Sequence, residues 1–372
     1  MKYREYGNTG AKVSQLGFGC MRLPTVDGKV NRPEAARILS RAVDLGVNFF
    51  DSAYVYHSGE SEEVLGEALG ERRDLVYIST KNHYKGDDPS KWREYLDTSL
   101  ERLGVDYIDF YHIHDLRLSE YLSHLLPNGP MEEARKAKEE GLIRHLCFSS
   151  HDDSENVNRL VDTGEFEGIL VQYNLFDRHN HETISYAESR GLGVAIMGTV
   201  GGGQLIPKGR DLASKVEGKH PVPELAIRYV LSHPGVTVAL SGMNSIEMLE
   251  ENASAADIDV PLGPEENEQI GRIMEEIEEL SGLYCTGCNY CMPCESGVDI
   301  PANFAALNLS RTWGMDVMAK IQYEALGKRE VEGEARPAWA KACVECGNCE
   351  GKCPQGIDIP ARLKEVDEAL SK

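Results

Sequence analysis

Eight of the ten cysteines lie between Cys285 and Cys353, at spacings that suit metal ligation. The first four are each separated by two residues, and the second four follow the spacing C-x2-C-x2-C-x3-C with Pro354 after the last. The two quartets are Cys285, Cys288, Cys291 and Cys294, and Cys343, Cys346, Cys349 and Cys353. Three thiolates two residues apart can surround one face of an iron–sulfur cube, while the fourth cysteine reaches a different iron. The quartets therefore predict two [4Fe–4S] clusters.

The second quartet matches the cysteine run of bacterial ferredoxins residue for residue. In two-cluster ferredoxins the fourth cysteine of each run binds the other cluster. That pattern assigns Cys285, Cys288, Cys291 and Cys353 to one cluster, and Cys343, Cys346, Cys349 and Cys294 to the other. Zinc is the alternative, but it prefers two C-x2-C pairs separated by a longer loop. Four cysteines within ten residues fit a zinc site less well.

A repeated segment follows each quartet. Residues 297–302 read Gly-Val-Asp-Ile-Pro-Ala, and residues 356–361 read Gly-Ile-Asp-Ile-Pro-Ala. Pro301 and Pro360 stand where the first turn of a helix tolerates proline, and the residues that follow have helical patterns. We also expect a long helical stretch over about residues 301–327. The C-terminal domain is therefore predicted to be a small, mainly α-helical ferredoxin-like unit.

Residues 15–255 alternate β-branched or aromatic runs with amphipathic segments such as RPEAARILSRAVDLG. The runs are SQLGFGC, VNFFDSA, LVYISTK, YIDFYHIH, IRHLCFSS, GILVQYN, GVAIMGT and VTVALSG. Eight strands alternating with eight helices predict an α/β fold, the closed parallel (β/α)8 TIM barrel. An open doubly wound sheet is the alternative. Its first strand is usually followed by a glycine fingerprint, which GFGCMRL is not.

The segments on either side of this region mark the limits of the barrel. The N-terminal MKYREYGNTGAKV has an Asn-Thr-Gly turn between two extended runs, which predicts a hairpin on the barrel floor. After residue 255 the alternation gives way to Pro261, Gly263 and Pro264, and then to an acidic helix, GRIMEEIEEL. We therefore place the barrel in residues 1–262 and the ferredoxin-like domain in residues 263–372.

Polar side chains are predicted at the carboxyl ends of the barrel strands, where the active sites of such barrels lie. They are Asp51, Tyr56, Lys81, His83, His114, Ser149, Ser150, Gln172 and Asn174. A tyrosine beside a lysine that is paired with an aspartate can donate a proton, because the ammonium lowers the pKa of a phenol from its ordinary value of about 10. That chemistry suits carbonyl reduction. Each residue also has a purely structural explanation, as a half-buried aromatic, a surface charge, a core histidine or a helix cap.

Over nearly all of residues 1–255 the sequence resembles the aldo-keto reductase family. The resemblance is carried by DSAYVY with Asp51 and Tyr56, STK with Lys81, DFYHIH with His114, GLIRHLCFSS and QYN. It implies that these four residues form the catalytic tetrad of the family, with Tyr56 as the general acid. The combination of these barrel motifs with CTGCNYCMPC is similar to a branch of the family, the iron–sulfur-containing aldo/keto oxidoreductases, which have a C-terminal ferredoxin-like (4Fe–4S) domain.

The resemblance also implies a nicotinamide cofactor, but several of its contacts are altered. Ser149 matches a family serine, whereas Ser150 stands where asparagine is usual. The family glutamine falls at Leu170, and Gln172 lies two positions later. Met197 replaces the aromatic residue on which nicotinamide stacks.

Other departures concern the phosphate of the cofactor. Gly242 and Met248 stand where the family has a lysine and an arginine that hold the 2′-phosphate of NADP. Because neither residue is charged, we expect the chain to bind NAD at least as well as NADP. Glu251 and Asn252 match the adenine contacts of the family. Candidates for phosphate contact through backbone amides are Ser241, Gly242, Met243 and Asn244, and the Gly201-Gly202-Gly203 loop, which could instead be a lid hinge. A flavin is the alternative cofactor.

Composition limits the partners. The 61 acidic and 39 basic residues give a formal net charge of -22, which opposes binding to nucleic acid and anionic membranes. The N-terminal residues lack an apolar signal core, and no run approaches the roughly 20 apolar residues of a spanning helix, so we expect a cytoplasmic protein.

The leading hypothesis is an oxidoreductase that acts on a carbonyl- or alcohol-type substrate and whose clusters exchange single electrons with a partner protein. The alternatives are an iron–sulfur electron-transfer or binding protein with the barrel as scaffold, a flavin-dependent oxidoreductase, and a reductase whose clusters are structural.

Overall fold

The structure is a computed structural model that describes residues 1–175, 177–200, 221–258, 262–277, 285, 288–313, 316–331 and 334–371. The chain divides into two compact units. The first contains Met1–Val200 and His220–Asn267, and the second contains the described residues from Glu268 onward. Helix α11 (Pro264–Ile277) crosses the limit between the units, so the domain boundary expected at residue 262 stays a prediction.

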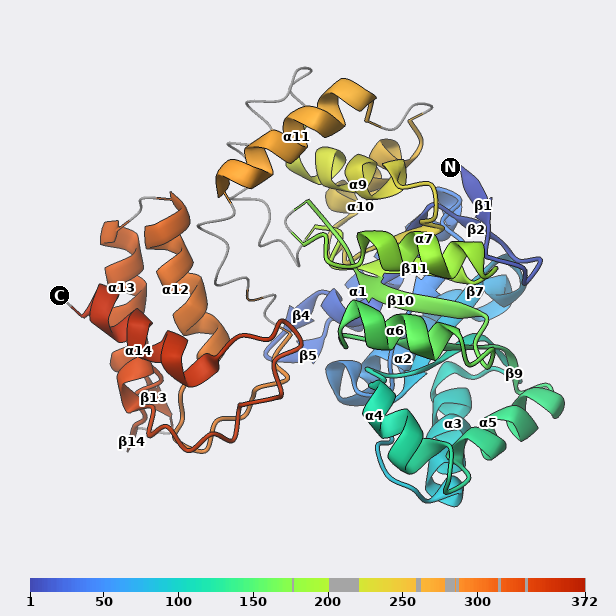
Figure 1. The fold of residues 1–372 in the computed structure, drawn as a ribbon, viewed down its shortest axis with the longest axis horizontal. Helices are drawn as coiled ribbons and strands as arrows, with labels where there is room; N and C mark the ends of the chain where they lie inside the picture. Colours follow the sequence, from blue (N-terminus) through green and yellow to red (C-terminus); the bar gives the residue numbers. More distant parts are fainter. Residues whose placement is uncertain are drawn as a thin grey trace. The chain divides into compact units, whose positions relative to one another are not determined.

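The first unit contains a closed barrel of parallel strands in the order β10-β11-β12-β3-β6-β7-β8-β9, which confirms the predicted fold (Figure 1). The strands are β3 (Leu16–Gly19), β6 (Phe49–Asp51), β7 (Tyr77–Asn82), β8 (Ile108–Ile113), β9 (Ile143–Ser149), β10 (Gly168–Gln172), β11 (Gly193–Met197) and β12 (Val238–Ser241). Each of the eight predicted runs coincides with one of these strands, and only β7 extends beyond its run, by one residue. Most of their residues are buried, as expected for parallel strands that helices cover.

Amphipathic helices alternate with the strands and surround the barrel in Figure 1. They are α1 (Arg32–Asp44), α2 (Glu60–Leu69), α3 (Pro89–Leu103), α5 (Pro130–Glu139), α6 (Ser154–Val161), α7 (His181–Ser189), α9 (Val222–Ser232) and α10 (Ile246–Ala256). Helix α3 shows how local sequence sets their ends. The Asp88 side chain accepts hydrogen bonds from the amides of Ser90 and Lys91, and Gly104 ends the helix with φ 63°. A short helical insertion, α4 (Leu118–Glu120) and η4 (Tyr121–Leu125), separates β8 from α5.

The predicted N-terminal hairpin is present as β1 (Tyr3–Glu5) paired with β2 (Lys12–Ser14). The buried ring of Tyr6 follows β1 and packs 5.7 Å from the ring of Phe49 and 4.5 Å from that of Phe110. A side chain at Gly193, the first residue of β11, would place its Cβ 2.0 Å from the Tyr6 ring, so only glycine fits there. Tyr6 therefore fills the barrel at the end where the strands begin, opposite the expected active site.

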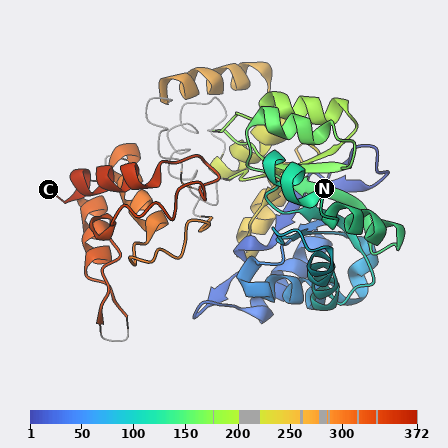
Figure 2. The ribbon, with the colours of Figure 1, turned by 60° about the horizontal axis from the view of Figure 1, so that its bottom comes forward.

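The second unit is mainly helical, as predicted. Helices α12 (Ile300–Trp313), α13 (Asp316–Gly327) and α14 (Ile359–Leu370) pack side by side, in orange to red in Figures 1 and 2, around the buried Phe304, Leu363 and Val366. A turn η7 (Ala340–Ala342) and a small hairpin, β13 (Glu330–Val331) with β14 (Glu334–Ala335), connect α13 to the second quartet.

Two helix predictions were wrong in extent. The helical stretch expected over residues 301–327 consists of two helices, α12 and α13. Residues 314 and 315, between the two helices, lie outside the described residues. Helix α11 begins at Pro264, before the acidic segment that predicted it, because proline suits a first helical turn and the Glu266 side chain accepts a hydrogen bond from the amide of Gly263. None of the described helices is long and apolar enough to cross a lipid bilayer.

Candidate active site and candidate cluster sites

A buried ion pair lies at the carboxyl ends of β6 and β7. Lys81 Nζ is 2.6 Å from Asp51 Oδ2, and the two side chains are only 1% and 5% exposed. Ser79 donates a hydrogen bond to the other Asp51 oxygen at 2.8 Å, and Lys81 also donates to the carbonyl of Ser52. Burying two charges is costly unless both are paired and hydrogen-bonded. These contacts therefore fix the Lys81 ammonium inside the barrel, and Asp51 does not act as a helix cap.

Tyr56 and His114 lie beside this ion pair. Lys81 Nζ is 5.0 Å from the centre of the Tyr56 ring. The rings of Tyr56 and His114 have centroids 6.1 Å apart and meet edge to face at 84°. Burial, followed by the charge of Lys81, holds the pKa of His114 well below its ordinary value of 6.5, so its imidazole is neutral at neutral pH. The structure thus brings together all four residues predicted as the tetrad.

The turn that carries Tyr56 has an unusual backbone. Tyr56 begins the turn η2 (Tyr56–Gly59), in which His57 and Ser58 adopt left-handed φ values of 50° and 58°. Residues other than glycine rarely adopt this conformation, and such residues gather at functional sites. Gly59, with φ 99°, then leads into α2.

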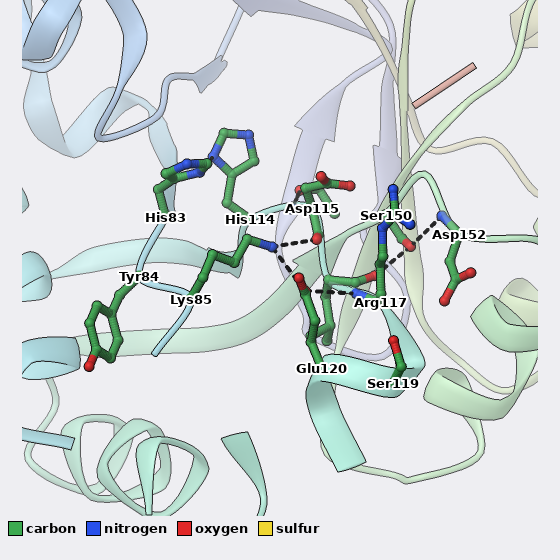
Figure 3. Close-up of polar contacts among 12 residues, drawn as sticks. His83, Tyr84, Lys85, His114, Asp115, Arg117, Ser119, Glu120, Ser150 and Asp152 are labelled. Atoms are coloured by element: carbon green, nitrogen blue, oxygen red, sulfur yellow. Dashed lines mark hydrogen bonds and ion pairs between the residues drawn. The ribbon is translucent and has the colours of Figure 1, made fainter. Parts of the chain in front are cut away.

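A second histidine contacts His114 at the mouth of the barrel. His83 Nδ1 lies 3.3 Å from His114 Nδ1, and the rings are 5.1 Å apart (Figure 3). From the same loop, Lys85 donates hydrogen bonds to the carbonyl of Asp115 at 2.6 Å and to Glu120 Oε2 at 3.1 Å (Figure 3). Burial, followed by the charge of Lys85, lowers the pKa of His83. The loop after β7 is therefore tied to the loop after β8.

The predicted serines at the end of β9 hold that second loop. Ser149 Oγ accepts a hydrogen bond from the amide of Asp115 at 2.9 Å. Ser150 Oγ donates to the carbonyl of Leu116 at 2.6 Å and accepts from the amide of Asp152 at 3.1 Å (Figure 3). Both hydroxyls thus have structural partners in the loops around the predicted cofactor site.

The predicted residues after β10 and β11 also engage neighbouring loops. Gln172, the last residue of β10, donates to Asp177 Oδ2 at 2.7 Å. Asn174 donates to the carbonyl of Gly198 at 3.0 Å. Met197 ends β11 and is half-buried. The predicted Gly201-Gly202-Gly203 loop lies outside the described residues.

Residues after β12 form the other part of the predicted cofactor site. Asn252 donates a hydrogen bond to Ser241 Oγ at 3.1 Å. Met243 is buried, whereas Asn244 and Glu251 are exposed. Ser241 ends β12, Met243 and Asn244 follow it, and Glu251 and Asn252 lie within helix α10, whose first turn is capped by the hydroxyl of Ser245.

Arg22, a cation near this site, was not predicted from the sequence. A Cβ on Gly242 would lie 3.0 Å from Cβ of Arg22, so the two residues are direct neighbours. They meet because β12 pairs with β3 in the barrel and both residues follow the ends of these strands. The only signal in the sequence was an arginine behind the first barrel strand. Backbone amides, buried polar side chains and an arginine whose side chain starts beside Gly242 are groups that fit a polar, anionic dinucleotide.

Two cavities in the second unit are lined by cysteines. One has a volume of about 420 Å³, which includes open solvent, and is lined by Cys294, Cys343, Cys346 and Cys349, and also by Cys291. The other encloses about 310 Å³ and is lined by Cys285, Cys288, Cys291 and Cys353. The fourth cysteine of each run thus lies with the first three of the other run. This is the arrangement that cross-ligation requires, and ligation itself stays a prediction.

The surroundings of the thiols in these cavities disfavour the thiolate form while no metal is bound. Burial, followed by Cys285 and Cys288, raises the pKa of Cys291 to about 12. Burial also raises the pKa of Cys349, and Cys343 and Cys294 act in the same direction. Such thiols stay protonated unless a metal centre compensates their charge when they bind it as thiolates.

The repeated segment positions the two cavities in the same way. After each quartet the backbone turns at a glycine, and an aspartate then caps the next helix. Asp299 accepts a hydrogen bond from the amide of Ala302 at 3.2 Å, and Asp358 accepts from that of Ala361 at 3.1 Å. Pro301 and Pro360 stand in the first turns of α12 and α14, as predicted, and line the two cavities.

A parallel barrel with a buried lysine–aspartate pair beside a tyrosine, followed by a helical unit with two cysteine-lined cavities, defines a barrel oxidoreductase with an iron–sulfur domain. The sequence profile of the Aldo/keto reductase family matches residues 15–275, and that of the 4Fe-4S dicluster domain matches residues 284–358. The chain belongs to the Aldo/keto reductase family and carries a C-terminal 4Fe-4S dicluster domain.

Known proteins with similar sequences and structures agree with this assignment. L-galactose dehydrogenase from Arabidopsis thaliana is 30% identical over 76% of this chain and 97% of its own length. The holo form of the aldo-keto reductase AKR11C1 from Bacillus halodurans superposes with a TM-score of 0.66 at 28% identity, covering 73% of this chain and 96% of that one. An aldo-keto reductase from Klebsiella pneumoniae, solved in complex with NADPH, has a TM-score of 0.63 at 26% identity, covering 74% and 95%.

Proposed function

We propose that the barrel transfers a hydride between a nicotinamide cofactor and a carbonyl- or alcohol-type substrate, with Tyr56 as the general acid or base. The observation that carries this proposal is the Lys81 ammonium, buried against Asp51 and 5.0 Å from the centre of the Tyr56 ring. A cation in that position favours the phenolate over the phenol and so assists proton release.

Each residue of the tetrad has a distinct part in reduction. The Tyr56 hydroxyl donates its proton to the substrate oxygen as negative charge develops there, and Lys81 stabilises the phenolate that remains. Asp51 holds Lys81 in place through their 2.6 Å contact. His114, neutral at neutral pH, can donate a hydrogen bond to the same substrate oxygen. The nicotinamide, when bound, supplies the hydride.

The cofactor would lie along the loops after β9, β10, β11 and β12. The Klebsiella pneumoniae relative binds NADPH, which supports a nicotinamide cofactor here as well. Gly242 and Met248 lack the charge that would favour NADP, but Arg22 beside Gly242 could replace it. We therefore propose that the chain can bind NADP(H) through Arg22, with NAD(H) as the competing cofactor.

In the second unit, each cysteine-lined cavity would hold one [4Fe–4S] cluster. Cys285, Cys288, Cys291 and Cys353 would bind one, and Cys343, Cys346, Cys349 and Cys294 the other. Hydride transfer moves two electrons at once, whereas such clusters pass electrons singly. The clusters would therefore exchange single electrons with a protein partner, and a flavin, which takes up one or two electrons, would have to mediate between the clusters and the nicotinamide.

Anaerobic titration tests this proposal. The purified protein is titrated with NADH, NADPH and FMN while protein fluorescence reports binding, and EPR spectra are recorded after reduction. Stoichiometric binding of a reduced nicotinamide is expected, as are cluster signals that decay when a reactive carbonyl compound is added together with oxidised nicotinamide and FMN. Binding of FMN alone would contradict the nicotinamide assignment. Reduced clusters that persist with the carbonyl compound would contradict the relay.

A further inference from the structure

The contact between His83 and His114 joins two atoms of the same kind. Each histidine presents its Nδ1 to the other, at 3.3 Å. A neutral imidazole has one N–H donor and one bare nitrogen acceptor, so a hydrogen bond here needs one Nδ1 with a proton and the other without. The contact therefore couples the tautomer of His83 to that of His114.

The surroundings of both rings keep them neutral, which this coupling requires. Burial lowers the pKa of each histidine. Lys81, Lys85 and His151 also face His114 and oppose its protonation. Lys85 opposes protonation of His83, whereas Asp115 and Glu120 favour it more weakly. Two positive rings in contact are thus disfavoured at neutral pH.

The loop that carries His83 is held firmly in this orientation. Asn82, the last residue of β7, donates to the carbonyl of Trp92 at 3.0 Å, and its side-chain oxygen accepts from the amide of Tyr84 at 2.9 Å. Lys85 is anchored on the loop after β8. His83 lies between these two anchors with its ring turned toward His114 (Figure 3).

The role proposed for His114, donation of a hydrogen bond to the substrate oxygen, requires one particular tautomer. Because Nδ1 of His114 faces His83, Nε2 is the nitrogen through which His114 can meet a substrate oxygen. A carbonyl oxygen accepts hydrogen bonds, so Nε2 must carry the proton and Nδ1 must be the acceptor. The proton in the contact then belongs to His83.

We propose that His83 is a positioning residue whose Nδ1–H donates to Nδ1 of His114 and so holds His114 in the Nε2–H tautomer that can donate to the substrate carbonyl. This inference rests on the proposed function, because it assigns His114 a carbonyl partner. It identifies a residue outside the tetrad that determines which ring nitrogen of His114 carries the proton.

Two substitutions of His83 by side chains of similar shape test whether residue 83 must donate the hydrogen bond to His114. In His83→Asn the amide nitrogen can occupy roughly the place of Nδ1 and donate. In His83→Asp the carboxylate can only accept, so it draws the proton of His114 to Nδ1. We expect His83→Asn to keep kcat within about 5-fold of the unmodified protein and His83→Asp to lower it on the order of 100-fold, a typical contribution of a correctly placed proton donor. Tyr84→Phe, which removes from the same loop a hydroxyl that accepts a hydrogen bond from the amide of Asp88, is the matched control and should resemble His83→Asn.

A second measurement does not depend on turnover. Imidazole ¹⁵N chemical shifts distinguish the two tautomers, and His114→Gln assigns the resonances. We expect Nε2–H for His114 in the unmodified protein and in His83→Asn, and a protonated Nδ1 in His83→Asp. An Nδ1–H tautomer in the unmodified protein, or equal kcat in the Asn and Asp variants, would overturn the proposal. Absence of turnover with any carbonyl compound, with the expected tautomers present, would instead count against the proposed function.

Discussion

Lys81 Nζ and Asp51 Oδ2 lie 2.6 Å apart inside the barrel, where both side chains are almost fully buried. Since Lys81 comes from β7 and Asp51 from the end of β6, the pair exists only once these two strands are in register. The same contact has a catalytic consequence and a structural one. It places a cation beside Tyr56, and it creates a buried charge that depends on its partner.

Removing one member of this pair should destabilise the barrel strongly. Asp51→Asn leaves the Lys81 ammonium without its carboxylate, and breaking a buried pair typically costs about 3–5 kcal/mol of unfolding free energy. Denaturant unfolding measures it, with Glu250→Gln as the control, because Glu250 pairs with Arg41 at the surface and should contribute less than about 1 kcal/mol. The double variant Asp51→Asn, Lys81→Met should recover part of the loss. Equal effects of Asp51→Asn and Glu250→Gln would contradict this account.

Acid should destabilise the barrel through its buried histidines. Burial, followed by the charge of Lys81, lowers the pKa of His112 to about 3, and burial lowers that of His151 to about 4. An unfolded histidine has a pKa near 6.5, so between that pH and the folded pKa the unfolded chain binds more protons. Stability is therefore complete above about pH 6.5 and declines as the pH falls, by up to about 1.4 kcal/mol per pH unit for each such histidine.

His112→Leu tests this pH dependence. His112 is fully buried, and within the part of the chain that the structure describes neither of its ring nitrogens has a hydrogen-bond partner in regular geometry, although the backbone of Phe148 is close enough to affect its pKa. Leucine should therefore fit the site and flatten the decline in unfolding free energy between pH 7 and pH 5. Parallel pH curves for the variant and the unmodified protein would show that His112 does not contribute.

Pairs of cysteine substitutions distinguish cross-ligation from self-contained quartets. If Cys294 binds the cluster of the second run, Cys294→Ala with Cys346→Ala disables one cluster, and about four irons per chain remain after anaerobic reconstitution. Cys294→Ala with Cys288→Ala disables both, and little iron remains. Quartets that each close on their own cluster would give the reverse result, which iron analysis and Mössbauer spectra would reveal.

Arg22 should matter for the phosphate of the cofactor. Arg22→Ala is expected to raise the Kd for NADPH by roughly 10-fold or more while leaving that for NADH nearly unchanged, since a charge-assisted hydrogen bond contributes about 1.5–3 kcal/mol. Arg37→Ala is the control, because Arg37 is an exposed arginine paired with Glu34 on α1. Equal weakening of both nucleotides by Arg22→Ala would argue against a contact with the 2′-phosphate.

The sequence predicted those features that local patterns determine. The eight strands, the N-terminal hairpin and the capped helices after each quartet all follow from periodicity, turn residues and caps, and all are present. Arg22 and the contact of His83 with His114 could not be assigned, because both depend on which loops meet when the barrel closes. Gly242 meets Arg22 only because the last barrel strand pairs with the first.

The most direct test of the central claim is the turnover of Tyr56→Phe with a reactive carbonyl substrate. The substitution removes only the hydroxyl that donates the proton, so kcat should fall at least about 100-fold while nicotinamide binding is kept. Tyr54→Phe is the control, because the Tyr54 ring stacks on Tyr95 at 4.3 Å and lies under Arg102, outside the tetrad. Unchanged turnover in Tyr56→Phe, or equal losses in both variants, would contradict the assignment of Tyr56 as the proton donor.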